Sequence, residues 1–124
     1  MKGLTLDTGA LIALERRDKR MRTRLEAAYR SLTPVTVPAV VVIEWWRDDR
    51  GQRAILEQLE IEPTTERIAK AAGVAIREVG ATAVDAAVMA SAALRGDLVF
   101  TSDFADLQRL QRQFPNVRVM SVSS

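Results

Sequence analysis

Short runs of β-branched and other apolar residues alternate with longer segments of helical periodicity along almost the whole chain. The runs expected to form strands are residues 4–6, 35–37, 61–62, 97–101 and 117–122. Runs that are apolar throughout, such as Leu98–Phe100, are typical of strands buried on both faces of a sheet. Strands of this kind that alternate with helices favour parallel pairing. We therefore predict an α/β fold, a three-layer α/β/α sandwich with a short central parallel sheet.

The helical segments have clear start and stop signals. They cover residues 9–17, 19–31, 38–50, 53–59, 65–80 and 83–95, and a last one carries Leu107, Leu110 and Phe114. Pro38 suits the first turn of its helix, where a backbone N–H would have no partner. Thr82 is a good N-cap, and Gly80 and Gly96 are typical residues at helix C-termini. No repeat or linker interrupts this pattern, so residues 1–124 are predicted to form one domain.

Composition restricts the chemistry that this chain can perform. Its 124 residues include no Cys and no His, while 48% are hydrophobic and 27% are charged. Disulfides, thiol nucleophiles, Ser-His-Asp catalysis and most zinc and copper sites are therefore excluded. The groups that remain are carboxylates, hydroxyls, Lys and Arg. Because no apolar run approaches the length of a membrane span and no signal-peptide pattern is present, we expect a cytoplasmic protein without a membrane partner.

Several carboxylates stand alone in stretches that are otherwise apolar or uncharged. They are Asp7, Glu44, Asp85 and Asp103. An ionised carboxylate is costly to bury without a partner, and the sequence offers no matching buried Lys or Arg. Glu44 lies between an apolar run and two Trp residues, so most orientations are expected to bury it. In open parallel sheets, ligands bind beyond the carboxyl ends of the strands, where Asp7 and Asp103 are predicted to lie. We therefore expect the four acids in one crevice.

Each acid also has a purely structural explanation. Asp7 and Asp103 could cap the helices that follow them, and Asp85 could interact with the macrodipole of its helix. A single reason for all four isolated acids is simpler than a separate structural role for each. Two converging carboxylates about 4 Å apart repel by about 4 kcal/mol at an effective dielectric near 20, so they take up protons or bind a cation. Oxygen ligands without His or Cys favour Mg²⁺ or Mn²⁺, which would activate a water molecule as the nucleophile.

The basic residues are unevenly placed, although the net charge is only +2. Residues 15–30 contain seven Lys and Arg but only three Asp and Glu. Arg predominates, and its guanidinium suits bidentate contact with phosphate. Met21, Leu25 and Ala28 form an apolar stripe, so the Arg side chains could simply be the solvated face of a helix. A polyanionic partner is the other interpretation, and together with a magnesium site it indicates phosphate chemistry.

Four short motifs, in this order and at this spacing, resemble those of PIN-domain ribonucleases of the VapC type, the toxins of bacterial toxin–antitoxin pairs. They are Leu6-Asp7-Thr8, Pro38 to Glu44, Ala83 to Ala87, and Val99 to Asp106. The resemblance covers nearly the whole chain and implies a PIN-like fold. It also implies an endoribonuclease that requires Mg²⁺ or Mn²⁺ and cleaves structured RNA, such as tRNA or rRNA, leaving a 5′-phosphate and a 3′-hydroxyl.

The resemblance also assigns roles to individual residues. The catalytic acidic quartet that it implies is Asp7, Glu44, Asp85 and Asp103. These four and Asp106, which corresponds to a further acid of many members, are candidate metal ligands, with Asp7 and Asp103 the first choices for direct ligation. Candidate hydroxyl donors that orient the carboxylates are Thr8, Thr101 and Ser102. Thr8 could equally be a plain helix-start residue, and Asp106 a surface helix residue.

Partners follow from the same resemblance. It implies a homodimer and a cognate antitoxin whose tail packs in a groove and blocks the site, so that DNA would be contacted only indirectly through the antitoxin. Trp45 and Trp46 diverge by about 100° on a helix, so we do not expect both to be fully buried in one core. One of them could line a partner groove or stack on a base, and core packing of both is the alternative.

Three other functions are compatible with parts of this pattern. Asp7 to Ala10 mimics the signature of aspartic proteases, but that fold is all-β. A phosphoacceptor receiver domain would need a Lys after a late strand, and the only lysines are Lys2, Lys19 and Lys70. The stronger alternative is a catalytically inactive PIN-like module that binds RNA or protein.

Overall fold

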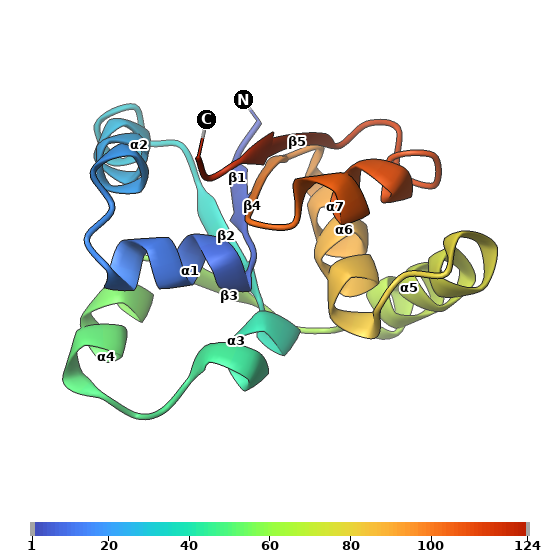
Figure 1. Cartoon of the computed structure of the whole chain (residues 1–124), viewed down its shortest axis with the longest axis horizontal. Coiled ribbons are helices and arrows are strands. Elements are labelled where there is room, and N and C mark those ends of the chain that lie inside the picture. Colours follow the sequence, from blue (N-terminus) through green and yellow to red (C-terminus); the bar gives the residue numbers. More distant parts are fainter. Residues whose placement is uncertain (1, 124) are drawn as a thin grey trace.

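The computed structural model describes residues 2–123. Within them, a parallel sheet of five strands has the order β3-β2-β1-β4-β5 (Figure 1). The strands are β1 (Leu4–Leu6), β2 (Val35–Pro38), β3 (Glu60–Glu62), β4 (Leu98–Thr101) and β5 (Arg118–Ser121). All five lie within about two residues of their predicted positions, and the predicted parallel pairing is confirmed.

The order of the strands reverses in the middle of the sheet. β1 is followed on one side by β2 and then β3, whereas β4 pairs with the other side of β1 and is followed by β5. Leu4 is accordingly in register with both Val35 and Leu98. At such a switch point a crevice opens beyond the carboxyl ends of the two diverging strands. Here these are the ends of β1 and β4, which Asp7 and Asp103 follow.

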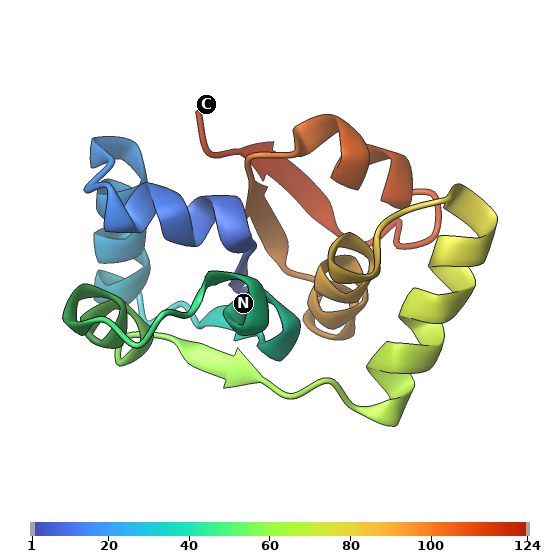
Figure 2. The same cartoon turned by 60° about the horizontal axis from the view of Figure 1, so that its bottom comes forward.

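Helices cover both faces of the sheet. They are α1 (Thr8–Glu15), α2 (Lys19–Arg30), α3 (Ala39–Trp45), α4 (Arg50–Leu56), α5 (Glu66–Val79), α6 (Ala83–Arg95) and α7 (Phe104–Leu110). One side carries α1, α2 and α4, and the other carries α5, α6 and α7 (Figure 2). This is the predicted three-layer sandwich. Because α3 contacts both α1 and α6, it lies between the two helical layers. In the described part of the chain, no helix has the length and apolar character that a membrane span requires.

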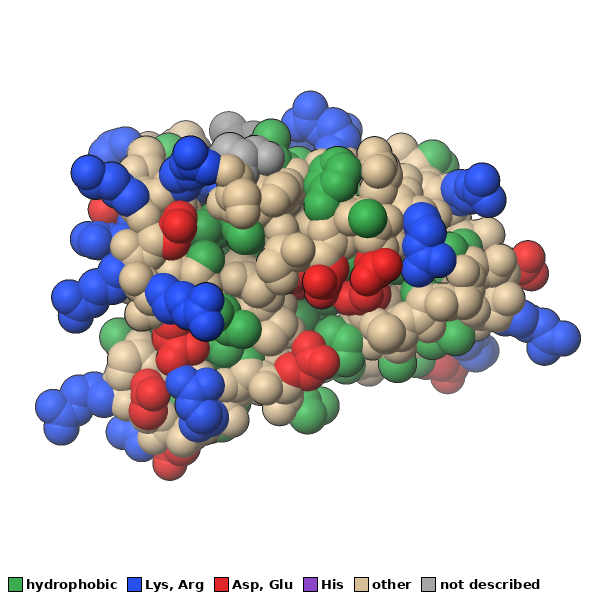
Figure 3. Space-filling model, viewed as in Figure 1, with side chains coloured by type: hydrophobic (Ala, Val, Ile, Leu, Met, Phe, Trp, Pro, Cys, Tyr) green, Lys and Arg blue, Asp and Glu red, His purple; other side chains and the backbone are tan. Residues whose placement is uncertain are grey.

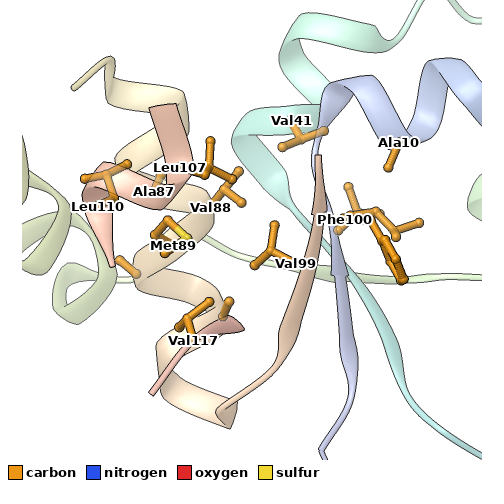
Figure 4. Packing of buried hydrophobic residues seen from close by; sticks show 14 of the residues in the cluster. Ala10, Val41, Ala87, Val88, Met89, Val99, Phe100, Leu107, Leu110 and Val117 are labelled. Carbon is orange, nitrogen blue, oxygen red and sulfur yellow. The ribbon is translucent and has the colours of Figure 1, made fainter. Parts of the chain in front are cut away.

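Consecutive residues of β4 enter different halves of the core. Val99 lies on the side of Val88 in α6, and Phe100 on the side of Ala10 in α1 (Figure 4). Each of these four side chains is at most 3% exposed. Successive side chains of a strand point to opposite faces, so burial on both faces anchors β4 between the two layers. The position of β4 in turn determines the position of Asp103, which follows the end of this strand.

The helix predicted for residues 38–50 is wrong in its extent. Pro38 is the N-cap rather than a residue of the first turn, and α3 ends at Trp45. Asp48 then adopts a positive φ of 57°, and Asp49 accepts a hydrogen bond from the backbone N–H of Gln52 at 2.8 Å. Asp side chains at such a position compete with helix continuation by capping a new helix. As a result α4 begins at Arg50, three residues before the predicted start.

A buried carboxylate that the sequence did not reveal lies at the opposite edge of the sheet. Asp97 is 2% exposed and precedes β4. It accepts hydrogen bonds from the backbone N–H of Gly3 at 3.0 Å, the hydroxyl of Thr5 at 2.8 Å and the guanidinium of Arg95 at 2.9 Å. The Arg95 ion pair compensates the buried charge. We therefore assign Asp97 to the fold, where it ties the beginning of β1 to β4.

Candidate functional site

Asp7 is the most buried of the predicted site residues, at 4% exposed. It directly follows β1 and is the N-cap of α1, where its Oδ1 accepts a hydrogen bond from the backbone N–H of Ala10 at 3.0 Å. Its Oδ2 accepts a hydrogen bond from the hydroxyl of Thr101 at the end of β4. Asp7 therefore has the capping role that was one of its two explanations. It also joins the ends of the two strands at the switch point.

Thr101 fixes the geometry on the β4 side of the crevice. Its side chain is fully buried, and the oxygen that donates to Asp7 also accepts a hydrogen bond from the backbone N–H of Asp103 at 2.8 Å. Its predicted role as a donor to a carboxylate is confirmed. Asp103 occupies the N-cap position of α7 without a side-chain capping bond, and it is exposed. The capping explanation for Asp103 is therefore wrong.

Glu44 is exposed, so the prediction that it is buried was wrong. Trp45 takes the core position instead, at 2% exposed, and the adjacent helical position points about 100° away from it. The hydroxyl of Thr8, in the first turn of α1, donates a hydrogen bond to Glu44 Oε1 at 2.6 Å. Thr8 thus has the predicted role of a carboxylate-orienting donor. Trp46 packs against the same core but is only partly buried, so the expectation that the two Trp residues are not both fully buried is confirmed.

Asp85 lies in the first turn of α6 and is partly buried. Thr82 is the N-cap, as predicted, and its hydroxyl accepts a hydrogen bond from the backbone N–H of Asp85 at 3.2 Å. The backbone of Asp85 therefore belongs to the cap, while its carboxylate is left to interact with solvent, with the helix dipole and with the other acids.

These side chains line one cleft of about 310 Å³, which lies beyond the carboxyl ends of β1 and β4. Its lining residues are Asp7, Thr8, Glu44, Thr82, Ala83, Val84, Asp85, Asp103 and Asp106. Figure 3 shows acidic side chains gathered where α1, α3, α6 and α7 meet in Figure 1. Within residues 2–123, no Lys or Arg forms an ion pair with any member of the predicted quartet. The four acids of the quartet do therefore share one crevice, and no Lys or Arg of the described residues gives them a direct counter-charge.

Burial and the neighbouring charges shift the protonation of Asp7. Its pKa is raised from 3.8 to about 6, mainly by burial and further by the charges of Asp103 and Asp85, while hydrogen bonds from Thr101 and Ala10 limit the rise. The environment of the Asp7 carboxyl group therefore disfavours its ionised form.

The same effects act on Asp85. Its pKa is raised first by burial and then by the charge of Asp103, with smaller contributions from Asp106 and Glu44, while a hydrogen bond between the side chains of Thr82 and Asp85 opposes the rise. Like charges that disfavour one another's ionisation are the signature of converging carboxylates, and a cation placed among them would reverse the effect.

The fit of this cleft to a metal ion depends on how many direct ligands the ion needs. As the side chains lie, no group of three or more carboxylates within residues 2–123 is close enough together to hold an ion. Simultaneous direct ligation by all of the candidate ligands is therefore absent from this arrangement, whereas direct ligation by Asp7 and Asp103, with Asp85 and Glu44 orienting metal-bound waters, stays a prediction. Mg²⁺, however, usually keeps several waters and binds one or two carboxylates directly. An all-oxygen cleft of about 310 Å³ fits such a hydrated ion, and the residues present suit Mg²⁺ or Mn²⁺.

Two further predicted residues have mixed outcomes. Asp106 lines the cleft, but it is exposed and lies 3.6 Å from Arg109 in an ion pair one turn along α7. It thus belongs to the cleft and to the helix surface at once. Ser102 is exposed and, in the described part of the chain, makes no hydrogen bond to any of the acids through its hydroxyl, so its predicted role as a donor is not supported.

Gly9 is a site-forming residue that sequence reasoning missed. A Cβ at this position would lie 2.5 Å from the Cβ of Ser102 and 3.0 Å from its backbone nitrogen. Only Gly allows the first turn of α1 to approach the loop after β4 so closely. That approach brings Asp7 and Asp103 to the same cleft. The Asp-Thr-Gly sequence was the available signal, although close packing cannot be read from it.

A second missed element holds α3 from the side away from the cleft. The indole N–H of Trp45 donates to Glu15 Oε1 at 2.7 Å, and the side chain of Gln52 donates to the carbonyl of Trp45 at 2.7 Å. Gln52 is itself fully buried. Since Glu44 precedes Trp45, these bonds from α1 and α4 fix the rotation of α3 and so the direction of Glu44.

Several solved structures from toxin–antitoxin complexes share this fold. A chain of the DNA-bound VapBC complex from Salmonella typhimurium matches with a TM-score of 0.74 and 17% identity, over 98% of this chain and 99% of that chain. VapBC2 from Rickettsia felis, bound to a fragment of promoter DNA, matches with a TM-score of 0.76 and 13% identity, over 95% and 97%. A toxin–antitoxin complex from Klebsiella pneumoniae matches with a TM-score of 0.72 and 20% identity, over 93% and 95%. At these identities the matches show the fold.

Comparison by sequence gives a clearer result for the family than for individual relatives. No curated protein matches this sequence as a relative. The family model of the PIN domain matches residues 4–112, which include both strands of the switch point and every acid of the cleft. The resemblance noted from the motifs is thereby confirmed at the level of the family. Because the match spans most of the sequence, this chain belongs to the PIN-domain family.

Proposed function

We propose that this protein is an endoribonuclease that depends on Mg²⁺ or Mn²⁺ and acts as the toxin of a toxin–antitoxin pair. The observation that carries the proposal is the cleft at the switch point, where Asp7, Glu44, Asp85 and Asp103 from four separate segments meet without an ion pair to any Lys or Arg within residues 2–123. PIN domains are generally nucleases, which supports a reaction at a phosphodiester. VapBC assemblies among the structural neighbours support the toxin role.

Asp7 and Asp103 are the residues best placed to hold the ion, because they follow the two strands that form the crevice. Asp85, Glu44 and Asp106 complete the negative lining, directly or through ordered water. A bound divalent ion would polarise the phosphoryl oxygen and acidify a water molecule. Since the chain has no His, no imidazole competes for the role of general base.

The protein's own groups prepare this cleft. Asp7, with a pKa of about 6, is mostly ionised at pH 7.5, and its two oxygens are oriented by Thr101 and Ala10. Thr8 holds Glu44 at 2.6 Å on the opposite wall. Hydrogen bonds of this kind fix carboxylate rotamers before substrate arrives.

The partners in this proposal are structured RNA, such as tRNA or rRNA, a cognate antitoxin and a second copy of the chain, all in the cytoplasm. DNA would be contacted through the antitoxin. Neighbours that are toxin–antitoxin complexes, two of them bound to DNA, support the antitoxin and the indirect DNA contact.

The test compares two isosteric neutralisations. Asp7→Asn should abolish Mg²⁺-dependent cleavage of a labelled structured RNA and leave the fold intact by circular dichroism. Glu78→Gln, an exposed acid of α5 outside the cleft, removes the same charge and should cleave like the wild type. Cleavage by Asp7→Asn at the wild-type rate would show that the catalytic assignment is wrong.

The second candidate function is a PIN-like module that binds RNA or protein without cleaving it. The observation in its favour is that no three carboxylates in residues 2–123 are close enough to hold an ion as they lie. In that case the wild-type protein would bind RNA in Mg²⁺ or Mn²⁺ but leave it uncut, and the divalent ion would not raise its melting temperature.

A further inference from the structure

We propose that the basic surface at the junction of α1 and α2 binds the phosphates of the same RNA whose scissile bond enters the acidic cleft. This inference rests on the function proposed above. We call the surface the basic ridge, and it consists of Arg16, Arg17, Lys19, Arg20, Arg22 and Arg24. Figure 3 shows basic side chains gathered along the side of the molecule where α1 ends and α2 lies, away from the central acidic group.

A sharp turn between the helices makes the ridge compact. Arg17 has a positive φ of 60°, and its backbone N–H donates to the carbonyl of Leu14 at 3.0 Å. Asp18, the acid that interrupts the ridge, is used as the N-cap of α2, where it accepts a hydrogen bond from the backbone N–H of Met21 at 2.9 Å. The turn therefore sets the end of one helix against the start of the next, and Arg17 and Arg22 line the same hollow of about 350 Å³.

Several of these cations have no partner among residues 2–123. In the described part of the chain, Arg16, Arg17 and Arg22 are exposed, and none makes an ion pair or a side-chain hydrogen bond. The adjacent acid Glu15 is instead paired with Arg47. Unpaired like charges repel one another, and a bound polyanion relieves that repulsion.

Other members of the ridge are ordered by the fold. The guanidinium of Arg24 lies 4.6 Å from the ring centre of Phe100, and Arg20 donates a hydrogen bond to the carbonyl of Ser123. Together with Lys19 and Thr23 they line a hollow of about 390 Å³. Cations that are held in place lose less side-chain entropy when a phosphate binds.

Helix α1 connects the ridge to the cleft. Thr8, its first residue, lines the cleft, and Arg16 follows its last residue. Eight residues at about 1.5 Å each separate them by about 12 Å. That is longer than the Debye length of about 8 Å at physiological salt, so the acids of the cleft only weakly oppose phosphate binding on the ridge. The distance of about 12 Å also corresponds to about three or four nucleotides at about 3.4 Å each. A strand bound on the ridge can therefore deliver a phosphodiester into a cleft that would otherwise repel it.

The test measures RNA binding without cleavage, in the Asp7→Asn background, by anisotropy of a labelled RNA hairpin across a salt series. The ridge variant is R16Q/R17Q/R22Q. The control R67Q/R77Q/R112Q removes the same charge from exposed Arg side chains of α5 and of the segment after α7. The ridge variant should bind about tenfold more weakly at about 0.1 M salt and lower the slope of log K against log salt by about 2. The control should stay within about twofold of the parent protein, with the same slope.

Further measurements distinguish the different ways in which the proposal could fail. R16K/R17K/R22K keeps the charges and should retain most of the salt slope, and melting curves verify that each variant folds. Equal binding by the ridge and control variants would overturn the proposal. Weaker capture of a polyglutamate peptide with unchanged RNA binding would assign the ridge to a protein partner and also overturn it. Failure of the wild-type protein to cleave RNA would refute the nuclease function, while the binding result would still stand on its own.

Discussion

Replacing Asp7 by Asn should stabilise the metal-free protein at neutral pH, although it destroys the proposed site. The pKa of Asp7 is raised from 3.8 to about 6 in the folded chain. Between these two values the folded state binds more protons than the unfolded state, so the contribution of Asp7 to stability is complete below 3.8 and is lost as the pH rises through about 6. At about 1.4 kcal/mol per pH unit, the whole difference is about 3 kcal/mol.

Asn lacks the charge but also offers a single acceptor oxygen. Either Ala10 N–H or the Thr101 hydroxyl then loses its acceptor, at a cost of about 1 kcal/mol. We therefore expect Asp7→Asn to raise the free energy of unfolding by about 2 kcal/mol at about pH 7.5, or the melting temperature by roughly 8 °C. Near pH 4 the gain should vanish, because Asp7 of the wild type is then largely protonated in the folded state.

The assay is urea denaturation in EDTA, followed by circular dichroism at several pH values, with Glu78→Gln as the control. The informative quantity is the difference between variant and wild type as a function of pH. A difference that does not change between about pH 4 and about pH 8, or a variant less stable than the wild type at about pH 7.5, would refute the argument that burial and neighbouring acids destabilise this carboxylate.

Three other predictions address the metal and the packing around the site. Adding Mg²⁺ should raise the melting temperature of the wild type and of Glu78→Gln but not that of the Asn variant described above, as differential scanning fluorimetry would detect. Gly9→Ala should destabilise the protein by about 2 kcal/mol in urea denaturation, because the new Cβ meets Ser102, and should lower RNA cleavage by the folded fraction. Arg95→Gln should cost about 3 kcal/mol by leaving the buried Asp97 carboxylate without its cation, while cleavage per folded molecule stays unchanged.

Local signals in the sequence were sufficient for most of the fold. Apolar runs long enough to be buried on both faces identified the strands, and α6 begins and ends as predicted because Thr82 caps it and Gly96, at a φ of 69°, closes it. Such signals act within a few residues, so they can be read without knowing the rest of the chain. The helix predicted for 38–50 is wrong in its extent because the prediction followed the apolar pattern of residues 39–45 and did not include the cap at Asp49, which begins a new helix.

Part of the site could be predicted from the sequence. An isolated acid in an apolar stretch is, like a helix cap, a local signal. A lone acid in an apolar stretch is unusual wherever it lies, and the order of elements placed Asp7 and Asp103 beyond strand ends. Burial was less predictable. The sequence pattern predicts a buried Glu44, which is exposed, and gives no sign that Asp97 is buried, although it is 2% exposed.

The sequence alone thus determined which elements form and which residue types can do chemistry. The tertiary structure decided which neighbours each acid has. Only the packed fold could show that Thr101 from β4 donates to Asp7 after β1, that Trp45 takes the core position beside Glu44, and that Arg95 pairs with Asp97. These contacts join residues far apart in the chain, and their energies depend on burial and on distances that no local pattern encodes.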